Sequence, residues 1–214
     1  MVHLSAARLD DGHFDTEEVR PGDKPCLSTS RLIALPNNHY KLPPKLAAGF
    51  SSLDVSCDAP IRANLVADNI TTDTFRIAVE TWGESILHSA ASTWIEHKAH
   101  ARDCVFGQFD TQDESTNFTV MANGRKGSLT KQPIRKSAAP KKYGKVIPFP
   151  RPFKEQPDVI CWLNRVELNS GEDYNYKVRA FADKITPSGF SAHLNTWDDD
   201  GSLPGAGMAW IAFP

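Results

Sequence analysis

The sequence predicts an all-β protein built of two tandem antiparallel β-sandwich modules, with about six strands in each module. The first observation behind this fold class is a series of short segments rich in Val, Ile, Phe and Thr, separated by Gly, Pro, Asn and Asp. The second is that apolar residues nowhere keep a sustained three-to-four-residue spacing, which argues against a long amphipathic helix. The third is an internal repeat that divides the chain into two similar halves.

The repeat is visible in two places along the chain. The phrase G-x-F-D-T occurs at Gly12 and again at Gly107. Further on, "ADNITTDTFRIAVETW" ends at Trp82 and "ADKITPSGFSAHLNTW" ends at Trp197, and the identical residues keep one constant separation. Self-similarity over this length indicates two copies of one structural unit.

Each copy has the size of a domain with its own core, so we expect modules over residues 1–99 and 100–214. The second copy carries an insertion at about 124–145 that has basic residues and no acidic residue, which is typical of an exposed loop. The expected strands are 31–35, 46–55, 62–70, 74–82 and 86–97, then 145–149, 159–168, 176–185, 189–197 and 203–213.

Composition narrows the class of protein. The formal charge of −2 gives no reason to expect a nucleic-acid partner. No apolar run reaches the length of about 18 residues that would predict a membrane span, and the N-terminus lacks the pattern of a signal peptide. The four cysteines do not recur at equivalent positions of the two copies, so we expect mostly free thiols in a reducing compartment. The expected location is the cytoplasm, or outside the cell by a non-classical route.

Strand alternation places one tryptophan of each copy on the polar side of its sheet. Side chains on a strand point alternately to opposite faces. Trp82 and Trp197 therefore lie opposite the apolar residues Phe75, Ile77 and Val79 in the first copy and Phe190, Ala192 and Leu194 in the second. An outward indole can stack on the C–H face of a sugar, or it can pack under a loop or against another subunit. For Trp94 and Trp210 we expect a packing or subunit-contact role.

The pattern offers no catalytic residue, cofactor site or metal site. His97 and His100 lie three positions apart, and without a recognisable set of acids or cysteines beside them we interpret both as surface residues. The acidic run at Asp198 lacks the spaced ligands and distal glutamate of a calcium loop. No nucleophile elbow, phosphate-binding loop or zinc spacing is present, so we do not expect an enzyme.

The sequence resembles the H-type lectin domain family. The resemblance rests on "RLIALPNNHYKLPPKLAAGFSSLDV", "ADNITTDTFRIAVETW" and "STWIEH" in the first copy, and on their counterparts in the second. It implies a six-stranded antiparallel sandwich that binds terminal galactose or N-acetylgalactosamine without a metal. It also implies assembly into trimers, with the sugar site near the contact between neighbouring protomers.

The family's sugar-binding positions match this sequence only in part. The positions that the resemblance points to are Gly22, Asp23, Trp82 and His88 in the first copy, and Trp197 and Asp198 in the second. His88 stands in place of a tyrosine, while Gly83 and Asp198 stand in place of a histidine. The family's binding arginine is replaced by Val66 and Phe181. A missing donor weakens or alters binding, because a polar group of the sugar is left unpaired.

Three functions agree with these observations. The first is a non-catalytic lectin for galactose, N-acetylgalactosamine or an altered glycan, made multivalent by its two modules and by homo-oligomerisation, with a trimer as one option. The alternative is a structural or protein-interaction protein that has kept the sandwich and lost sugar binding. A third is an accessory module for an enzyme acting elsewhere.

Overall fold

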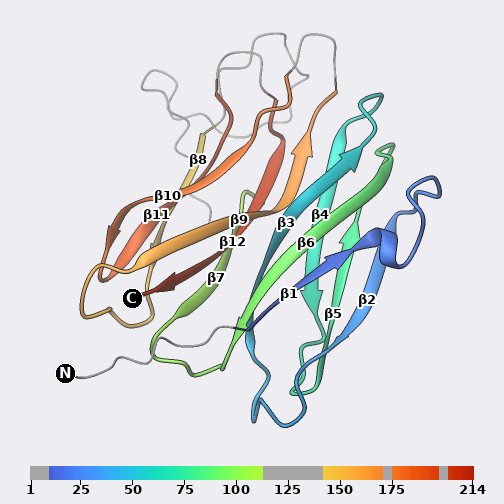
Figure 1. Ribbon diagram of the computed structural model, residues 1–214. Coiled ribbons are helices and arrows are strands. Elements are labelled where there is room, and N and C mark those ends of the chain that lie inside the picture. The colour runs from blue at the N-terminus through green and yellow to red at the C-terminus, as the bar shows by residue number, and fades with distance from the viewer. Residues whose placement is uncertain (1–9, 113–141, 171–174, 198–201) are drawn as a thin grey trace.

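The computed structural model describes residues 10–112, 142–170, 175–197 and 202–214, and the fold is all-β as predicted (Figure 1). Within these segments the single helical element is the 3-10 turn η1 (Thr16–Glu18). No helix in this part of the chain has the length and apolar content needed to cross a membrane.

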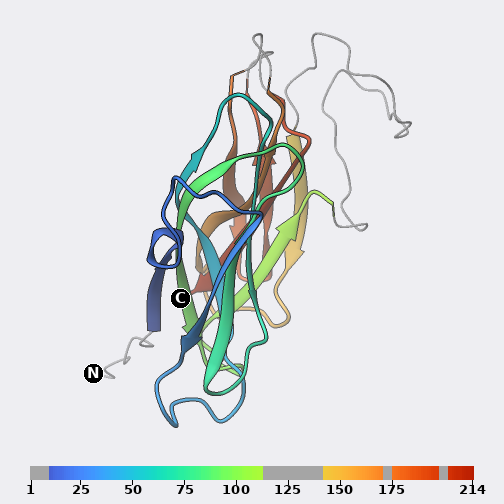
Figure 2. The same cartoon turned by 90° about the vertical axis from the view of Figure 1, so that its right-hand side faces the viewer.

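Each half of the chain contributes six strands arranged as two stacked three-stranded layers. In the first half, β1-β6-β3 lies against β2-β5-β4; in the second, β7-β12-β9 lies against β8-β11-β10. Figure 2 shows the layered arrangement from the side. The strands of the first half are β1 (Asp10–Asp15), β2 (Ser28–Ala34), β3 (Lys45–Val55), β4 (Ile61–Asp68), β5 (Thr74–Glu80) and β6 (Leu87–His97). Those of the second are β7 (Val105–Asp110), β8 (Lys142–Pro148), β9 (Asp158–Leu168), β10 (Arg179–Thr186), β11 (Gly189–Asn195) and β12 (Gly205–Phe213).

The predicted alternation is confirmed, because the two halves have separate cores made of the residues assigned to the apolar faces. Phe75, Ile77 and Val79 are fully buried in the first core, and Phe190, Ala192 and Leu194 are at most 2% exposed in the second. The strand prediction omitted β1 and β7, whose sequences each place a single phenylalanine in the core. Residues 142–145 of the predicted insertion belong to β8, and residues 124–141 lie outside the described part of the chain. The predicted division between residues 99 and 100 falls between β6 and β7 and stays a prediction.

The glycines of the repeated G-x-F-D-T phrase each lie under a buried tryptophan. A Cβ on Gly12 would lie 2.1 Å from the ring of Trp94, and a Cβ on Gly107 would lie 2.3 Å from the ring of Trp210. Trp94 is 6% exposed and Trp210 is 4% exposed, so the predicted packing role of both is confirmed. Only glycine lets the first strand of each half approach the tryptophan of the last strand this closely.

The threonine that ends the same phrase joins the first and last strands of each half. The Thr16 hydroxyl accepts a hydrogen bond from the Ala90 backbone N–H at 2.9 Å. The Thr111 hydroxyl accepts one from the Ala206 N–H at 3.0 Å. Both threonines are buried, so an unpaired N–H here would be costly. The repeated phrase is therefore a structural element that fixes how each sandwich begins.

The two sandwiches are joined by strand pairing that the sequence did not predict. Strand β4 of the first half pairs with β9 of the second, from Ile61 opposite Leu168 to Asn64 opposite Arg165. This contact makes one continuous sheet of six strands, β2-β5-β4-β9-β12-β7. The pairing ends where β9 changes its register with β12, between residues 163 and 165.

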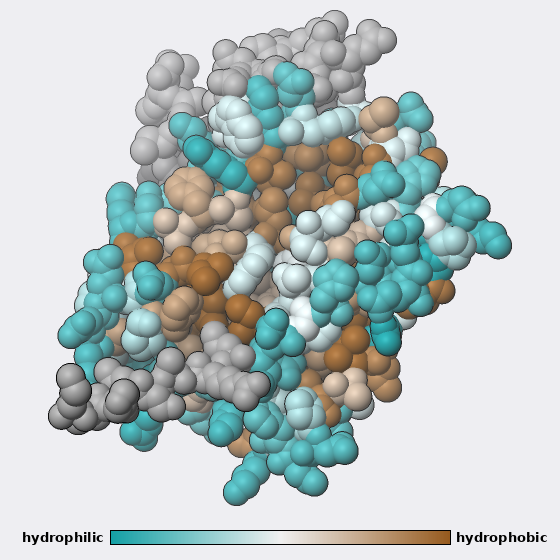
Figure 3. All heavy atoms as spheres, in the orientation of Figure 1, coloured by the Kyte–Doolittle hydropathy of each residue, from teal (hydrophilic) through white to brown (hydrophobic). Residues whose placement is uncertain are grey.

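A second contact between the halves explains a tryptophan that has no equivalent in the first copy. Gly49 on β3 lies against Trp162 on β9, and a Cβ on Gly49 would be 2.1 Å from the Trp162 Cβ. Gly49 is the residue that the repeat aligns with Trp162. One copy thus supplies the large side chain and the other supplies the space for it. Figure 3 shows apolar side chains gathered over the middle of this side of the molecule, around β9.

Candidate functional site

Charged side chains from both halves meet where β4 pairs with β9. The Arg165 guanidinium donates one hydrogen bond to the Asp110 carboxylate at 3.1 Å and another to the Glu167 carboxylate at 2.8 Å. Arg62, on β4 of the first half, places its Nε 3.7 Å from Glu167 Oε1. Arg165 is only 8% exposed, so these charges are partly removed from water and depend on one another.

Trp82 is the predicted site residue that belongs to this cluster. It follows β5, is half-buried and is absent from both cores, so its predicted outward orientation is confirmed. The Arg165 guanidinium carbon lies 5.5 Å from the centre of its ring, within the range of a cation–π contact. The indole of the first half is therefore in contact with a cation supplied by the second.

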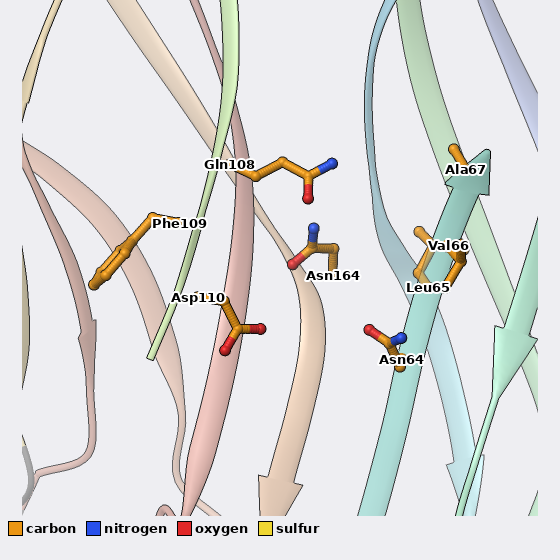
Figure 4. A pocket seen from close by; sticks show the side chains of 8 residues that line it. All are labelled: Asn64, Leu65, Val66, Ala67, Gln108, Phe109, Asp110 and Asn164. Atoms are coloured by element: carbon orange, nitrogen blue, oxygen red, sulfur yellow. The ribbon is translucent and has the colours of Figure 1, made fainter. Parts of the chain in front are cut away.

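A polar cavity of about 220 Å³ opens beside this pair, between β4, β7 and β9. Its polar lining consists of Asn64, Gln108, Asp110 and Asn164, whose side chains point toward one another in Figure 4. Gly207 is needed behind it, because a Cβ there would lie 2.7 Å from Asn164 Oδ1 and 2.8 Å from Asp110 Oδ2. The lining offers amide donors and both amide and carboxylate acceptors.

The cavity and the tryptophan–arginine pair form one site, because Asp110 lines the cavity and also accepts a hydrogen bond from Arg165. We refer to Asn64, Trp82, Gln108, Asp110, Asn164 and Arg165 together as the junction site. Both halves contribute to it, and the β4–β9 pairing positions it. Apart from Trp82, none of these residues was identified from the sequence, because nothing in the sequence shows that β4 and β9 are neighbours.

The equivalent tryptophan of the second half stands at an open face. Trp197 is 41% exposed, and the Arg179 guanidinium carbon lies 5.8 Å from its ring and 5.0 Å from the ring of Phe181. The Phe181 ring stacks on His193 with 4.6 Å between centroids, and His193 Nε2 lies 2.9 Å from the Asp183 carboxylate. This row of aromatic and charged groups runs across β10 and β11, with Trp197 at its end.

The H-type lectin domain model matches residues 37–95 and 145–213. The chain belongs to the H-type lectin domain family. The two matched segments fall on the two halves of the fold, in agreement with two tandem copies of the lectin domain. No curated protein matches the chain.

The predicted lectin residues of the first copy, other than Trp82, lie beside η1. The Gly22 carbonyl oxygen is 3.4 Å from His88 Nδ1, and Asp23 is exposed. The Arg20 guanidinium fixes this loop, because it donates to the Thr29 hydroxyl at 2.7 Å and to the His88 carbonyl at 2.8 Å. The structure thus brings Gly22 and His88 together, and their sugar-binding roles stay predictions.

Two residues stand in place of the family's histidine, and one of them lies within the described chain. Gly83, in place of the family histidine, has a φ of +66°, and a Cβ would lie 2.5 Å from Arg62 Nη1. Glycine suits this left-handed conformation because it has no side chain to clash. Asp198, the corresponding residue of the second copy, lies outside the described residues.

One interpretation of the sequence is wrong. His97 is not a surface histidine without acidic or cysteine neighbours, since its side chain is only 12% exposed and Nε2 lies 3.3 Å from Asp103 Oδ1. The Cys104 sulfur lies in the same cluster. His100 is exposed, as expected. All four cysteines are free thiols, and burial raises the pKa of Cys104 to about 12 and that of Cys161 to about 11, so neither is a reactive thiolate.

Proposed function

We propose that this H-type lectin domain protein binds carbohydrate without catalysis, and that the junction site is a glycan-binding site. The observation that carries the proposal is the polar cavity beside the Trp82–Arg165 pair. A sugar needs several hydrogen-bonding groups that converge on its hydroxyls and an aromatic surface for its C–H face. The cavity supplies the hydrogen-bonding groups, and the Trp82 ring, linked to the cavity through Arg165 and Asp110, supplies the aromatic surface.

The chemistry of the cavity suits a small, neutral, hydroxylated ring. The amides of Asn64, Gln108 and Asn164 both donate and accept hydrogen bonds, and the Asp110 carboxylate accepts them. The cavity, at about 220 Å³, is below the range of about 300–1,000 Å³ typical of sites for drug-sized ligands. A terminal galactose, an N-acetylgalactosamine or a related monosaccharide is therefore the class of ligand that we propose.

Each of the two tryptophans has a guanidinium beside it, although the family's binding arginine is missing from both copies. Val66 and Phe181 occupy its place in the two copies. Arg165 nevertheless brings a guanidinium to Trp82, and Arg179 brings one to Trp197. Because a guanidinium can donate several hydrogen bonds, each tryptophan keeps a donor that could reach a bound hydroxyl.

We further propose that the protein acts multivalently, as an agglutinin or an adhesion protein. Trp197 with Arg179 would form a second, more open site on the same chain. Homo-oligomers, a trimer among them, would multiply both sites. Linked weak sites gain avidity without new contacts.

The test is a glycan array on the full chain, followed by calorimetric titration of each glycan that binds. We expect binding to galactose-type glycans or related sugars. Asn164→Ala should weaken binding about tenfold or more, because one buried hydrogen-bonding group is lost. Asn37→Ala, which changes an exposed asparagine away from the junction site, is the matched control. Silence across a broad glycan panel would contradict the function, and unchanged affinity in Asn164→Ala would contradict the junction site.

A structural role is the second candidate, and one observation favours it. The Arg165 guanidinium is already paired with Asp110 and Glu167, so the cluster holds the two halves together without a ligand. In that case the protein would be an assembly or interaction protein that has lost sugar binding. Light scattering and a pull-down would show a defined assembly or protein partner while the glycan array stays silent.

A further inference from the structure

We propose that His97, Asp103 and Cys104 form a zinc site at the connection between the two modules. The imidazole nitrogen, carboxylate oxygen and thiol sulfur of these residues all lie within 4.8 Å of one another. Within residues 10–112, 142–170, 175–197 and 202–214, this is the one such group of three. The proposal is independent of the proposed sugar binding.

The three donors come from the two ends of one short segment. His97 is the last residue of β6, and Asp103 and Cys104 directly precede β7. The segment between them reverses direction through a turn in which the Ala101 N–H donates to the Lys98 carbonyl at 3.0 Å. The turn brings the end of the first module back against the start of the second.

The cluster is sheltered and still reachable. Cys104 is 6% exposed and the His97 side chain 12%, whereas the Asp103 side chain is 44% exposed. A cavity of about 390 Å³ reaches Cys104 and is also lined by His100. A metal ion could therefore enter from this cavity and bind two donors that are already largely removed from water, on His97 and Cys104, and one that is half-exposed, on Asp103.

The chemistry of the donors selects the metal. Zinc is bound by imidazole, thiolate and carboxylate together, whereas Mg²⁺ and Ca²⁺ take oxygen ligands. Zinc–ligand distances of about 2.0–2.3 Å place tetrahedral ligand atoms about 3.5 Å apart. The His97 nitrogen and the Asp103 oxygen are already 3.3 Å apart. Because all three donor atoms lie within 4.8 Å of one another, bringing them to zinc-binding distances needs movements of about 1 Å. Zinc would displace the Cys104 thiol proton to solvent, and the resulting thiolate and the Asp103 carboxylate would neutralise the charge of the ion. The fourth position would stay open to water or another ligand.

The nearest cation of the second module does not occupy the site. The Arg151 guanidinium donates a hydrogen bond to the Ala101 carbonyl, so it is directed at the backbone of the connecting segment. A bound zinc ion would add to this contact by linking the last residue of β6 to the residues that begin β7. Because the metal binds the folded form, it would also stabilise that form by mass action.

The test uses Co²⁺ as a spectroscopic substitute for zinc in the chelator-treated full chain. The background carries Cys26→Ser and Cys57→Ser, which remove the two exposed thiols. We expect one equivalent of Co²⁺ to give a thiolate-to-cobalt charge-transfer band and the visible bands of a tetrahedral site, both displaced by Zn²⁺. Cys104→Ser should remove the charge-transfer band, and Asp103→Asn should weaken binding at least tenfold.

Cys161→Ser is the matched control, because it changes a partly buried thiol elsewhere in the fold and should leave the band intact. If Cys104→Ser fails to fold, His97→Gln is used in its place and should lose the tetrahedral visible bands. Absence of the band in the starting protein, or its persistence in folded Cys104→Ser, would overturn the proposal.

Discussion

The Arg165 guanidinium carbon lies 5.5 Å from the centre of the Trp82 ring, and the two residues belong to different copies of the lectin module. The contact exists because β4 and β9 pair and place Asn64 opposite Arg165. The outward tryptophan of the first copy is therefore part of the boundary between modules. Any ligand that binds there meets groups from both copies.

Arg165→Ala should destabilise the protein by about 3 kcal/mol, because it leaves the Asp110 and Glu167 carboxylates partly buried without their shared partner. Urea unfolding followed by circular dichroism measures the change. The control is Arg31→Ala, whose side chain is 50% exposed and pairs with Glu18, and which should change stability by less than about 1 kcal/mol. Equal effects of the two substitutions would contradict the prediction that the partly buried charge cluster contributes more stability than an exposed ion pair.

Gly49→Ala should destabilise the protein by about 1–3 kcal/mol, because the new methyl group would overlap Trp162. Trp162→Gly removes both the Cβ and the ring that the new methyl group would meet, so the double variant should be less destabilised than the sum of the two single variants. The measurement is a double-mutant cycle of unfolding free energies. Strict additivity would mean that the two residues do not contact each other in solution.

Thr16→Val and Thr111→Val should each destabilise the protein by about 1–3 kcal/mol. Each substitution removes the hydroxyl that accepts a buried backbone N–H, from Ala90 in one half and Ala206 in the other. Thr→Ser at the same positions keeps the hydroxyl and is the control. A valine variant as stable as its serine counterpart would contradict the role assigned to the repeated phrase.

The pH dependence of stability should report Glu96, which is 4% exposed. Burial raises the pKa of this carboxyl above its usual 4.5, and the nearby Asp10 acts in the same direction. Hydrogen bonds from the Tyr40 hydroxyl and the Trp94 indole N–H, and the charge of His39, oppose the rise. The folded state thus holds the proton more tightly than the unfolded chain.

The free energy of unfolding should therefore fall as the pH rises from about 4.5 through the folded pKa of Glu96. Glu96→Gln has no titrating proton, so the difference between wild type and variant should carry this slope. The Asp68 carboxyl has a lowered pKa because Arg76 donates a hydrogen bond to it. It therefore contributes stability that is lost as the pH falls below about 3.8, which is the opposite direction to Glu96. Identical pH profiles for wild type and Glu96→Gln would contradict this assignment.

The parts of the structure that depend on local pattern could be predicted from the sequence. Strand alternation correctly placed Phe75 and Phe190 in the two cores and Trp82 outside them. The junction site could not be predicted, because Arg165 and Trp82 are distant in sequence. They are brought into contact by the pairing of β4 with β9, which involves four residue pairs.

The His97 cluster had a signal that was missed. Asp103 and Cys104 follow His97 within a few residues, but the significance of that spacing depends on the turn that folds the segment back. The strands β1 and β7 are hard to predict, because glycine is unfavourable in a strand unless a neighbour needs the space. Here the neighbours are Trp94 and Trp210, from the last strand of each half.

The joining of β4 to β9 has an evolutionary consequence. These strands are not equivalents in the repeat, since β3 aligns with β9 and β4 aligns with β10. The union is therefore head-to-tail, and it gives the two copies unlike surroundings. Strand β4 pairs with the other copy, whereas β10 is an edge strand of its sheet within the described residues. Selection can then alter either copy separately, so one gene can diversify the surfaces of two modules while keeping a single architecture.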